Sequence, residues 1–157
     1  MALKGDRNYD ELVDISFFMS NATGERGCIV IHDTTVSGSG AAMDDANQLV
    51  MIPTGVISGK YPAGLLLNDV VNLDLTRQHI NQHKDEVQLG GKVTLLRRGT
   101  VVTNSITSGQ TPGPGQVAYA DTDGKFTPTG GSGKPIVGRF LSKMDADGYA
   151  KIDVNIE

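Results

Sequence analysis

The last stretch of the chain alternates apolar and polar residues over the length of a strand. Its apolar side chains stand at every second position, at Ala150, Ile152, Val154 and Ile156. Because successive side chains of a β-strand point to opposite faces, this pattern predicts a strand with one buried face and one solvent-exposed face. Residues 136–144 form another apolar run, and Asp147-Gly148 supplies a turn between the two. Residues 136–156 are therefore predicted to form a β-hairpin that is an integral part of the fold.

A second hairpin is predicted directly before the first. Val117 and Tyr119 lie on its incoming strand, Asp123-Gly124 forms the turn, and Phe126 lies on the returning strand. An Asp-Gly pair readily adopts the positive φ angles that a tight hairpin turn requires.

Further strands are expected upstream, with one ambiguous region. They are predicted at residues 13–19, 28–32, 49–52, 56–57 and 87–104, with loops at 33–48 and 105–116. Within the longest of these strands, Gly99 predicts a bend, a bulge or a close approach of another backbone. Residues 73–83 fit a strand that leads into a loop or a short turn of helix.

Many short strands separated by Gly, Pro and Asp-Gly turns indicate a mainly β fold. We predict an antiparallel β-sandwich or barrel with an extended N-terminal arm and long loops. The arm, residues 1–12, is polar and mixed in charge. It is expected to become ordered on a partner, with simple terminal disorder as the alternative. The predicted division is thus an arm at 1–12 and a β-rich domain at 13–157.

Composition and charge narrow the range of partners. The chain has 157 residues, a formal charge of −4 at pH 7, one cysteine and no tryptophan. An acidic chain argues against binding to the phosphate backbone of nucleic acids and to anionic membranes. Few aromatic residues argue against a module that stacks on sugars. The single cysteine, Cys28, lies in an apolar run and is expected to be a small buried core residue.

Candidate catalytic and metal sites fail on their spacing. Asp121 and Asp145 each begin an Asp-x-Asp-Gly stretch, but neither has the Glu that closes a calcium loop twelve residues long. His79 and His83 have zinc-ligand spacing, yet Ile80 stands where a zinc protease has Glu. Nucleophile elbows and phosphate-binding glycine loops are also missing from the sequence. We therefore expect no catalytic residues, no cofactor and no metal, and we expect that the protein is not an enzyme.

The C-terminal third resembles the small capsid decoration, or cement, proteins of tailed bacteriophages. The resemblance rests on the segments 115–119, 123–126, 136–140 and 147–154. In these proteins a strand that ends in tyrosine, a short hairpin and a Val-Gly strand precede a final alternating strand. The stretch from Pro62 to Val71 and on through residues 90–96 also looks like phage structural proteins. Together these segments cover about two-thirds of the chain.

The resemblance implies a structural role on the outside of a virion. Such proteins are added after capsid expansion, usually as trimers, and clamp adjacent major capsid protein subunits against the pressure of the packaged DNA. The implied partners are therefore the major capsid protein and further copies of the chain itself, with a trimer favoured over a dimer. No apolar segment of signal-peptide length follows Met1, which suggests synthesis in the host cytoplasm. A head fibre base, a tail protein and a host- or glycan-binding module are the alternatives.

Seven residues are predicted to contact partners. In the arm these are Leu3, Lys4, Arg7 and Tyr9, where the arm would add a strand to a neighbour's sheet with Tyr9 as its anchor. A mildly basic stretch further along the chain contributes Arg77, Arg97 and Arg98. That stretch is interpreted either as a solvated face or as a docking face for an acidic partner.

Overall fold

The computed structural model describes residues 3–4, 12–14, 16–19, 24–34, 49–55, 57–68, 86–87 and 93–156. Strands dominate these ranges, and a single 3-10 turn, η1 (Thr122–Gly124), is the helical element within them. The strands are β1 (Leu3–Lys4), β2 (Leu12–Asp14), β3 (Phe18–Met19), β4 (Gly24–Glu25), β5 (Ile29–His32), β6 (Leu49–Met51), β7 (Pro62–Asn68), β8 (Glu86–Val87), β9 (Thr94–Thr103), β10 (Val117–Ala120), β11 (Phe126–Thr127), β12 (Ile136–Phe140) and β13 (Ala150–Asn155). The prediction of a mainly β fold is confirmed.

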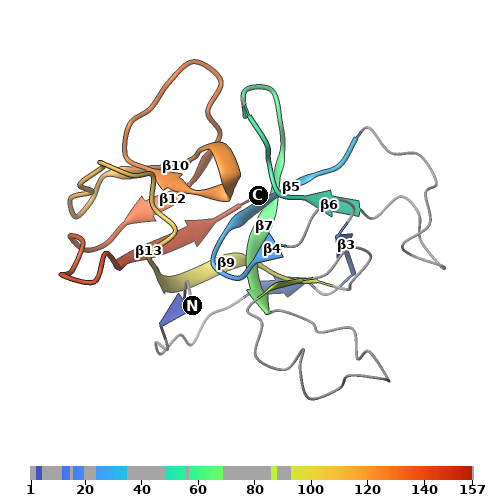
Figure 1. Ribbon diagram of the computed structural model, residues 1–157, viewed down its shortest axis with the longest axis horizontal. Coiled ribbons are helices and arrows are strands. Elements are labelled where there is room, and N and C mark those ends of the chain that lie inside the picture. The colour runs from blue at the N-terminus through green and yellow to red at the C-terminus, as the bar shows by residue number, and fades with distance from the viewer. Residues whose placement is uncertain are drawn as a thin grey trace.

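Most of these strands form one curled sheet that makes a half-barrel (Figure 1). Its order is β11-β10-β12-β13-β9-β7-β5-β6-β3, with β1 and β2 also paired to β9, while β4 and β8 pair separately. The ladders are antiparallel except for β3 with β6, which is parallel. The register shifts in four ladders, β10–β12, β2–β9, β5–β7 and β7–β9. Such bulges increase the local twist of a sheet, which accounts for its curl.

Strand β9 pairs with four other strands, β1, β2, β7 and β13. Arg98 pairs with Asn155 of β13 and with Leu12 of β2, so these two strands lie on opposite edges of β9. Leu96 likewise pairs with β7 on one edge and with β2 on the other. One edge of β9 is therefore shared by β7 and β13, and β1 and β2 line the other edge.

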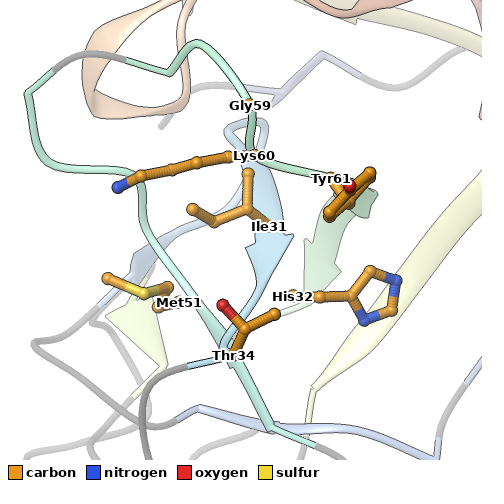
Figure 2. Close-up of a pocket in the computed structure, with 7 residues that line it drawn as sticks. All are labelled: Ile31, His32, Thr34, Met51, Gly59, Lys60 and Tyr61. Carbon is orange, nitrogen blue, oxygen red and sulfur yellow. The ribbon is translucent and has the colours of Figure 1, made fainter.

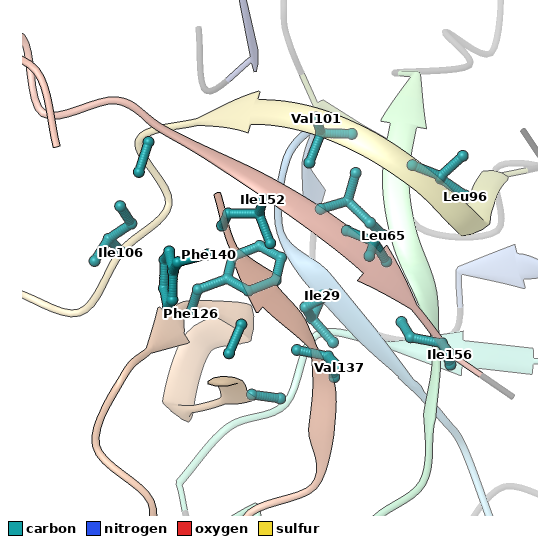
Figure 3. Close-up of a cluster of buried hydrophobic side chains, with 14 of the residues drawn as sticks. Ile29, Leu65, Leu96, Val101, Ile106, Phe126, Val137, Phe140, Ile152 and Ile156 are labelled. Atoms are coloured by element: carbon teal, nitrogen blue, oxygen red, sulfur yellow. The ribbon is translucent and has the colours of Figure 1, made fainter. Parts of the chain in front are cut away.

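The core consists of two clusters on opposite faces of the sheet. The larger fills the inside of the half-barrel and includes Phe126, Phe140 and Ile152 (Figure 3). The smaller contains Val30, Val50, Ala63, Leu66, Val93 and Leu95. Leu95 and Leu96, neighbours in the chain, belong to different clusters because successive residues of a strand point to opposite faces.

Both predicted hairpins are present. In the hairpin of β10 and β11, Ala120 pairs with Phe126, and Asp123 and Gly124 of the turn have φ angles of 59° and 70°. In the C-terminal hairpin, β12 and β13 pair through Phe140 and Ile152. The β2–β9 ladder shifts register at Arg97, whereas Gly99, where a bend or bulge was predicted, pairs in regular register with Val154.

Four local predictions are corrected. The expected strand at 13–19 is two strands, β2 and β3, which pair with different neighbours. Ile57 lies in no strand, and β12 ends at Phe140, four residues earlier than predicted. Cys28 is half-buried at the entrance to β5, outside the core. Residues 73–83 and the loop at 35–48 lie outside the described residues.

Candidate functional site

The outer face of the sheet, formed by β12, β13, β9 and β2, carries an extended set of exposed side chains in register. Cross-strand pairing places Asn155, Arg98 and Leu12 in one row on this face. A second row, two residues along each strand, runs through Arg139, Asp153 and Thr100. Paired residues in a sheet project from the same side, and their side chains lie within contact range of one another. We refer to these two rows, together with Ile136 and Lys151, as the outer face.

The outer face combines apolar and cationic groups. Leu12 is 56% exposed and Ile136 is 62% exposed, and both belong to regular strands. Arg98 and Arg139 are exposed and Lys151 is half-buried, whereas Asp153 is the one carboxylate of the set. Three cations against one carboxylate make this face basic in a chain whose formal charge is −4. Exposed aliphatic groups beside arginines are typical of protein-binding surfaces.

A shallow groove crosses the outer face. It is lined by Ile136, Gly138, Arg139, Asp153 and Asn155 and has a volume of about 220 Å³. Gly138 forms its base, where a Cβ atom would overlap the carbonyl oxygen of Asp153 on the neighbouring strand. The close approach of β12 to β13 at this glycine therefore leaves the groove open between the flanking side chains.

The structure describes four of the seven residues that were predicted to bind partners. Arg98 lies in the first row of the outer face. Arg97 projects elsewhere and is half-buried, with its Nε atom buried and without a hydrogen-bond partner. Leu3 and Lys4 form β1, which pairs with β9 of the same chain at Thr103 and Val102. Arg7, Tyr9 and Arg77 lie outside the described residues, so their role stays a prediction.

Several outer-face residues were not predicted from the sequence to lie on a binding surface. Asp153 and Asn155 are on the polar side of the predicted last strand, so the signal for them was present in the alternation. Leu12 belongs to the polar arm in the sequence, and Ile136 looks like a core residue because it belongs to an apolar stretch. Only the register of β2 and β12 against their neighbours shows that these two side chains face outward.

A charged cluster joins Asp14 of the N-terminal segment to Arg97 and His32. The hydroxyl of Ser16, the backbone N–H of Ser16 and the charges of Arg97 and His32 hold the pKa of Asp14 below its ordinary value, against the effect of burial. Burial and the nearby Arg97 lower the pKa of His32, and Asp14 opposes them. The His32 ring also packs edge-on against Phe17, with 5.3 Å between the ring centroids.

This cluster should make stability depend on pH. Because the pKa of His32 is lower in the folded state, the unfolded chain binds a proton more readily, so the free energy of unfolding should fall as pH drops below the ordinary value of 6.5. Further loss is expected as the pH falls below the ordinary value of 3.8 toward the lowered pKa of Asp14 in the folded state. Urea unfolding followed by circular dichroism between pH 5 and 8 tests the first step. A His32→Gln variant should show a clearly smaller slope, and an unchanged slope would contradict the assignment.

The described residues contain one free cysteine, Cys28. The Cys28 Sγ atom lies 3.3 Å from the Ser105 Oγ atom, and burial raises the pKa of the thiol. In the described ranges, His, Cys, Asp and Glu side chains do not gather in any group of three or more that could hold a metal ion. Nor do those ranges contain a helix long and apolar enough to cross a membrane.

Comparison with known proteins gives a consistent result. Residues 12–155 match the profile of a family described as structural cement protein (E217 gp24/Pam3 gp6). Among solved structures, a chain of one titled "The capsid of Myoviridae Phage XM1" has a TM-score of 0.61 and 15% sequence identity, covering 94% of this chain and 84% of that chain. At this identity the likeness shows the fold alone. No curated protein matches the sequence.

Proposed function

The chain belongs to the structural cement protein family of phages, and from this premise we propose that it decorates the outside of the capsid and clamps adjacent major capsid protein subunits. Membership of the family makes it a structural component of the phage capsid and places it in the virion. The finer statements, which are the clamping of subunits, the outward location and assembly as a trimer, are our proposal.

The outer face is the observation that carries this proposal. Its exposed groups stand on β2, β9, β13 and β12, each of which pairs with the next in this order. A surface presented by a regular sheet loses little conformational freedom when a partner binds, so more of its contact energy appears as affinity. Leu12 and Ile136 would contact apolar groups of the capsid surface, and Arg98 and Arg139 would contact acidic groups around them.

Weak individual contacts are sufficient for this role. A shell repeats the same binding site many times, and linked copies bind a repeated surface far more tightly than one copy binds a single site. The predicted donation of a strand by residues 1–12 would add main-chain hydrogen bonds to a neighbour's sheet. In the single chain, however, β1 and β2 are paired with β9, so they extend the outer face from its edge.

Binding to empty expanded capsids tests the proposal. The wild-type protein should co-sediment with the shells and saturate, and electron microscopy should place it outside the capsid. The double variant Leu12→Ser/Arg98→Gln should bind at least tenfold more weakly, as is typical when interface anchor residues are lost. Thr111→Glu is a control that lowers the net charge by the same one unit at an exposed position of the β9–β10 loop.

Two results would overturn the proposal. Failure of the folded wild-type protein to bind shells would rule out capsid decoration and favour another virion component. Equal binding by the double variant and the wild type would remove the outer face from the contact. Circular dichroism of each variant establishes that it is folded before binding is compared.

A further inference from the structure

A small apolar pocket opens beside β5, β6 and the segment that leads into β7. Ile31 lies at its centre, between Met51 on one side and Tyr61 on the other (Figure 2). His32, Thr34, Gly59 and Lys60 complete the lining. Its volume is about 110 Å³, compared with roughly 150 Å³ for an apolar protein cavity that accepts benzene. The pocket can therefore hold one side chain of medium size.

The rim of the pocket has the composition of a contact surface. Tyr61 is 67% exposed, the highest value among the large hydrophobic side chains described. Lys60 extends over the opposite side of the opening, and the seven lining residues include no carboxylate. An exposed aromatic ring beside a cation is suited to an apolar group that carries a negative charge next to it.

The turn between β12 and β13 has the complementary character. Met144 is 38% exposed at this tip, which we define as residues 141–149. Asp145 and Asp147 are exposed beside it, against one exposed lysine, Lys143. Two carboxylates and one ammonium group leave the tip with a net negative charge. The tip thus presents an unbranched apolar side chain beside exposed acidic groups, at the edge of a groove that residues 106–110 of the same chain also line.

Hydrogen bonds fix the shape of the tip. The backbone N–H groups of Asp147 and Tyr149 donate to the Asp145 Oδ1 atom, at 3.0 and 2.7 Å. The backbone N–H of Asp145 donates in turn to the carbonyl oxygen of Tyr149, at 2.8 Å. A projection held in this way loses little freedom on binding.

We propose that the Met144 tip of one copy of this chain docks in the Tyr61 pocket of a neighbouring copy. The flexible thioether would fill the irregular space over Ile31 and contact the Tyr61 ring, a favourable sulfur–aromatic pair. Asp147 would lie near Lys60 of the neighbour. Because tip and pocket are different surfaces, the contact is either repeated head-to-tail from copy to copy or made twice, reciprocally, in a two-fold dimer. This inference deepens the proposed function and rests on it in one respect, that several copies act together on a shell.

Charge reversal tests the pairing of Asp147 with Lys60. Light scattering over a range of protein concentrations should show self-association of the wild type. Lys60→Glu and Asp147→Lys should each weaken it by about tenfold or more, the loss expected for a close charge pair. The double variant Lys60→Glu/Asp147→Lys should recover most of the loss. Lys125→Glu is the control, since it makes the same charge change at a residue that lies in neither surface.

Cysteine cross-linking tests the contact directly. In a Cys28→Ser background, a mixture of the Tyr61→Cys and Met144→Cys variants should form a covalent dimer under mild oxidation, and reductant should reverse it. Each variant alone should form far less. A monomeric wild type at every concentration, no recovery in the charge-swap double variant, or no mixed dimer would overturn the inference.

The two proposals fail in distinguishable ways. If Lys60→Glu loses self-association but still co-sediments with shells, the tip–pocket contact and the capsid-binding role are both supported and are separate. If the wild type binds shells but self-associates without the tip, the inference fails and the proposed function stands. If the wild type self-associates through the tip but does not bind shells, the inference stands and the proposed function fails.

Discussion

Replacing Phe140 with alanine is expected to lower the free energy of unfolding by about 3–5 kcal/mol, the usual range for a buried phenylalanine. Phe140 is 0% exposed and belongs to the larger core cluster inside the half-barrel (Figure 3). Its ring packs with residues from several strands, so its removal leaves a cavity that no single loop movement can fill. The effect should appear in urea unfolding as a lower midpoint, followed by circular dichroism because the chain has no tryptophan.

The backbone at Phe140 makes collapse of such a cavity more difficult. Its N–H donates to the carbonyl oxygen of Gln116, and its own carbonyl oxygen accepts from the N–H of Gly115. The residue is thus fixed between the loop before β10 and the neighbouring β13. A site that cannot relax is expected to lie toward the upper end of the cost for a large-to-small substitution.

Ile136→Ala supplies the control within the same strand. Ile136 is on β12 as well, but it lies on the outer face, and its truncation should change stability by no more than about 0.5 kcal/mol. The same variant should nevertheless weaken binding to shells if the outer face is the contact surface. An equal loss of stability in the two variants would show that the division between core face and outer face is wrong.

The parts of the fold that are local in sequence could be predicted from it. The turn at Asp123 and Gly124 has the predicted positive φ angles, because the two residue types that tolerate them stand between two strands. The alternation from Ala150 to Ile156 likewise predicted the buried and wet faces of β13, since it depends on the period of a single strand.

Features that depend on the partner strand could not be predicted. Residues 13–19 look like one strand because nothing in their pattern shows that β2 pairs with β9 while β3 pairs with β6. Arg97 is the extra residue where β9 bulges against Leu12 and Val13, and it is half-buried whereas Arg98 is exposed, so two adjacent arginines with the same sequence signal have different surroundings. The candidate surface was for this reason recovered only at Arg98.

Long-range register also explains the pocket and the tip. Neither Met144 nor Tyr61 stands out in the sequence, where both resemble ordinary residues of turns and strand ends. Their common feature is exposure, which follows from where β12 ends and where β7 begins. A surface formed by residues from separate elements can be recognised only when the topology is known.

The second large effect is expected at Gly124, where alanine should lower the free energy of unfolding by about 3 kcal/mol or more. The residue has a φ of 70°, a conformation in which an L side chain costs roughly 1–2 kcal/mol. A Cβ atom there would also overlap the carbonyl oxygen of Ile29 and lie 3.0 Å from the Cβ atom of Cys28. The turn η1 would have to move away from β5, and the contact between the β10–β11 hairpin and β5 would be lost.

Gly148→Ala separates these two contributions. Gly148 has a similar φ of 86°, but no atom lies within 4 Å of the Cβ position, so its replacement should cost only the backbone term of about 1–2 kcal/mol. The difference between the two variants measures how firmly η1 is packed on β5, where the Asp123 N–H also donates to the carbonyl oxygen of Pro53 at 2.9 Å. Equal losses would mean that η1 is not fixed against β5. A clearly larger loss at Gly124 would show that the turn of the β10–β11 hairpin is packed firmly against β5.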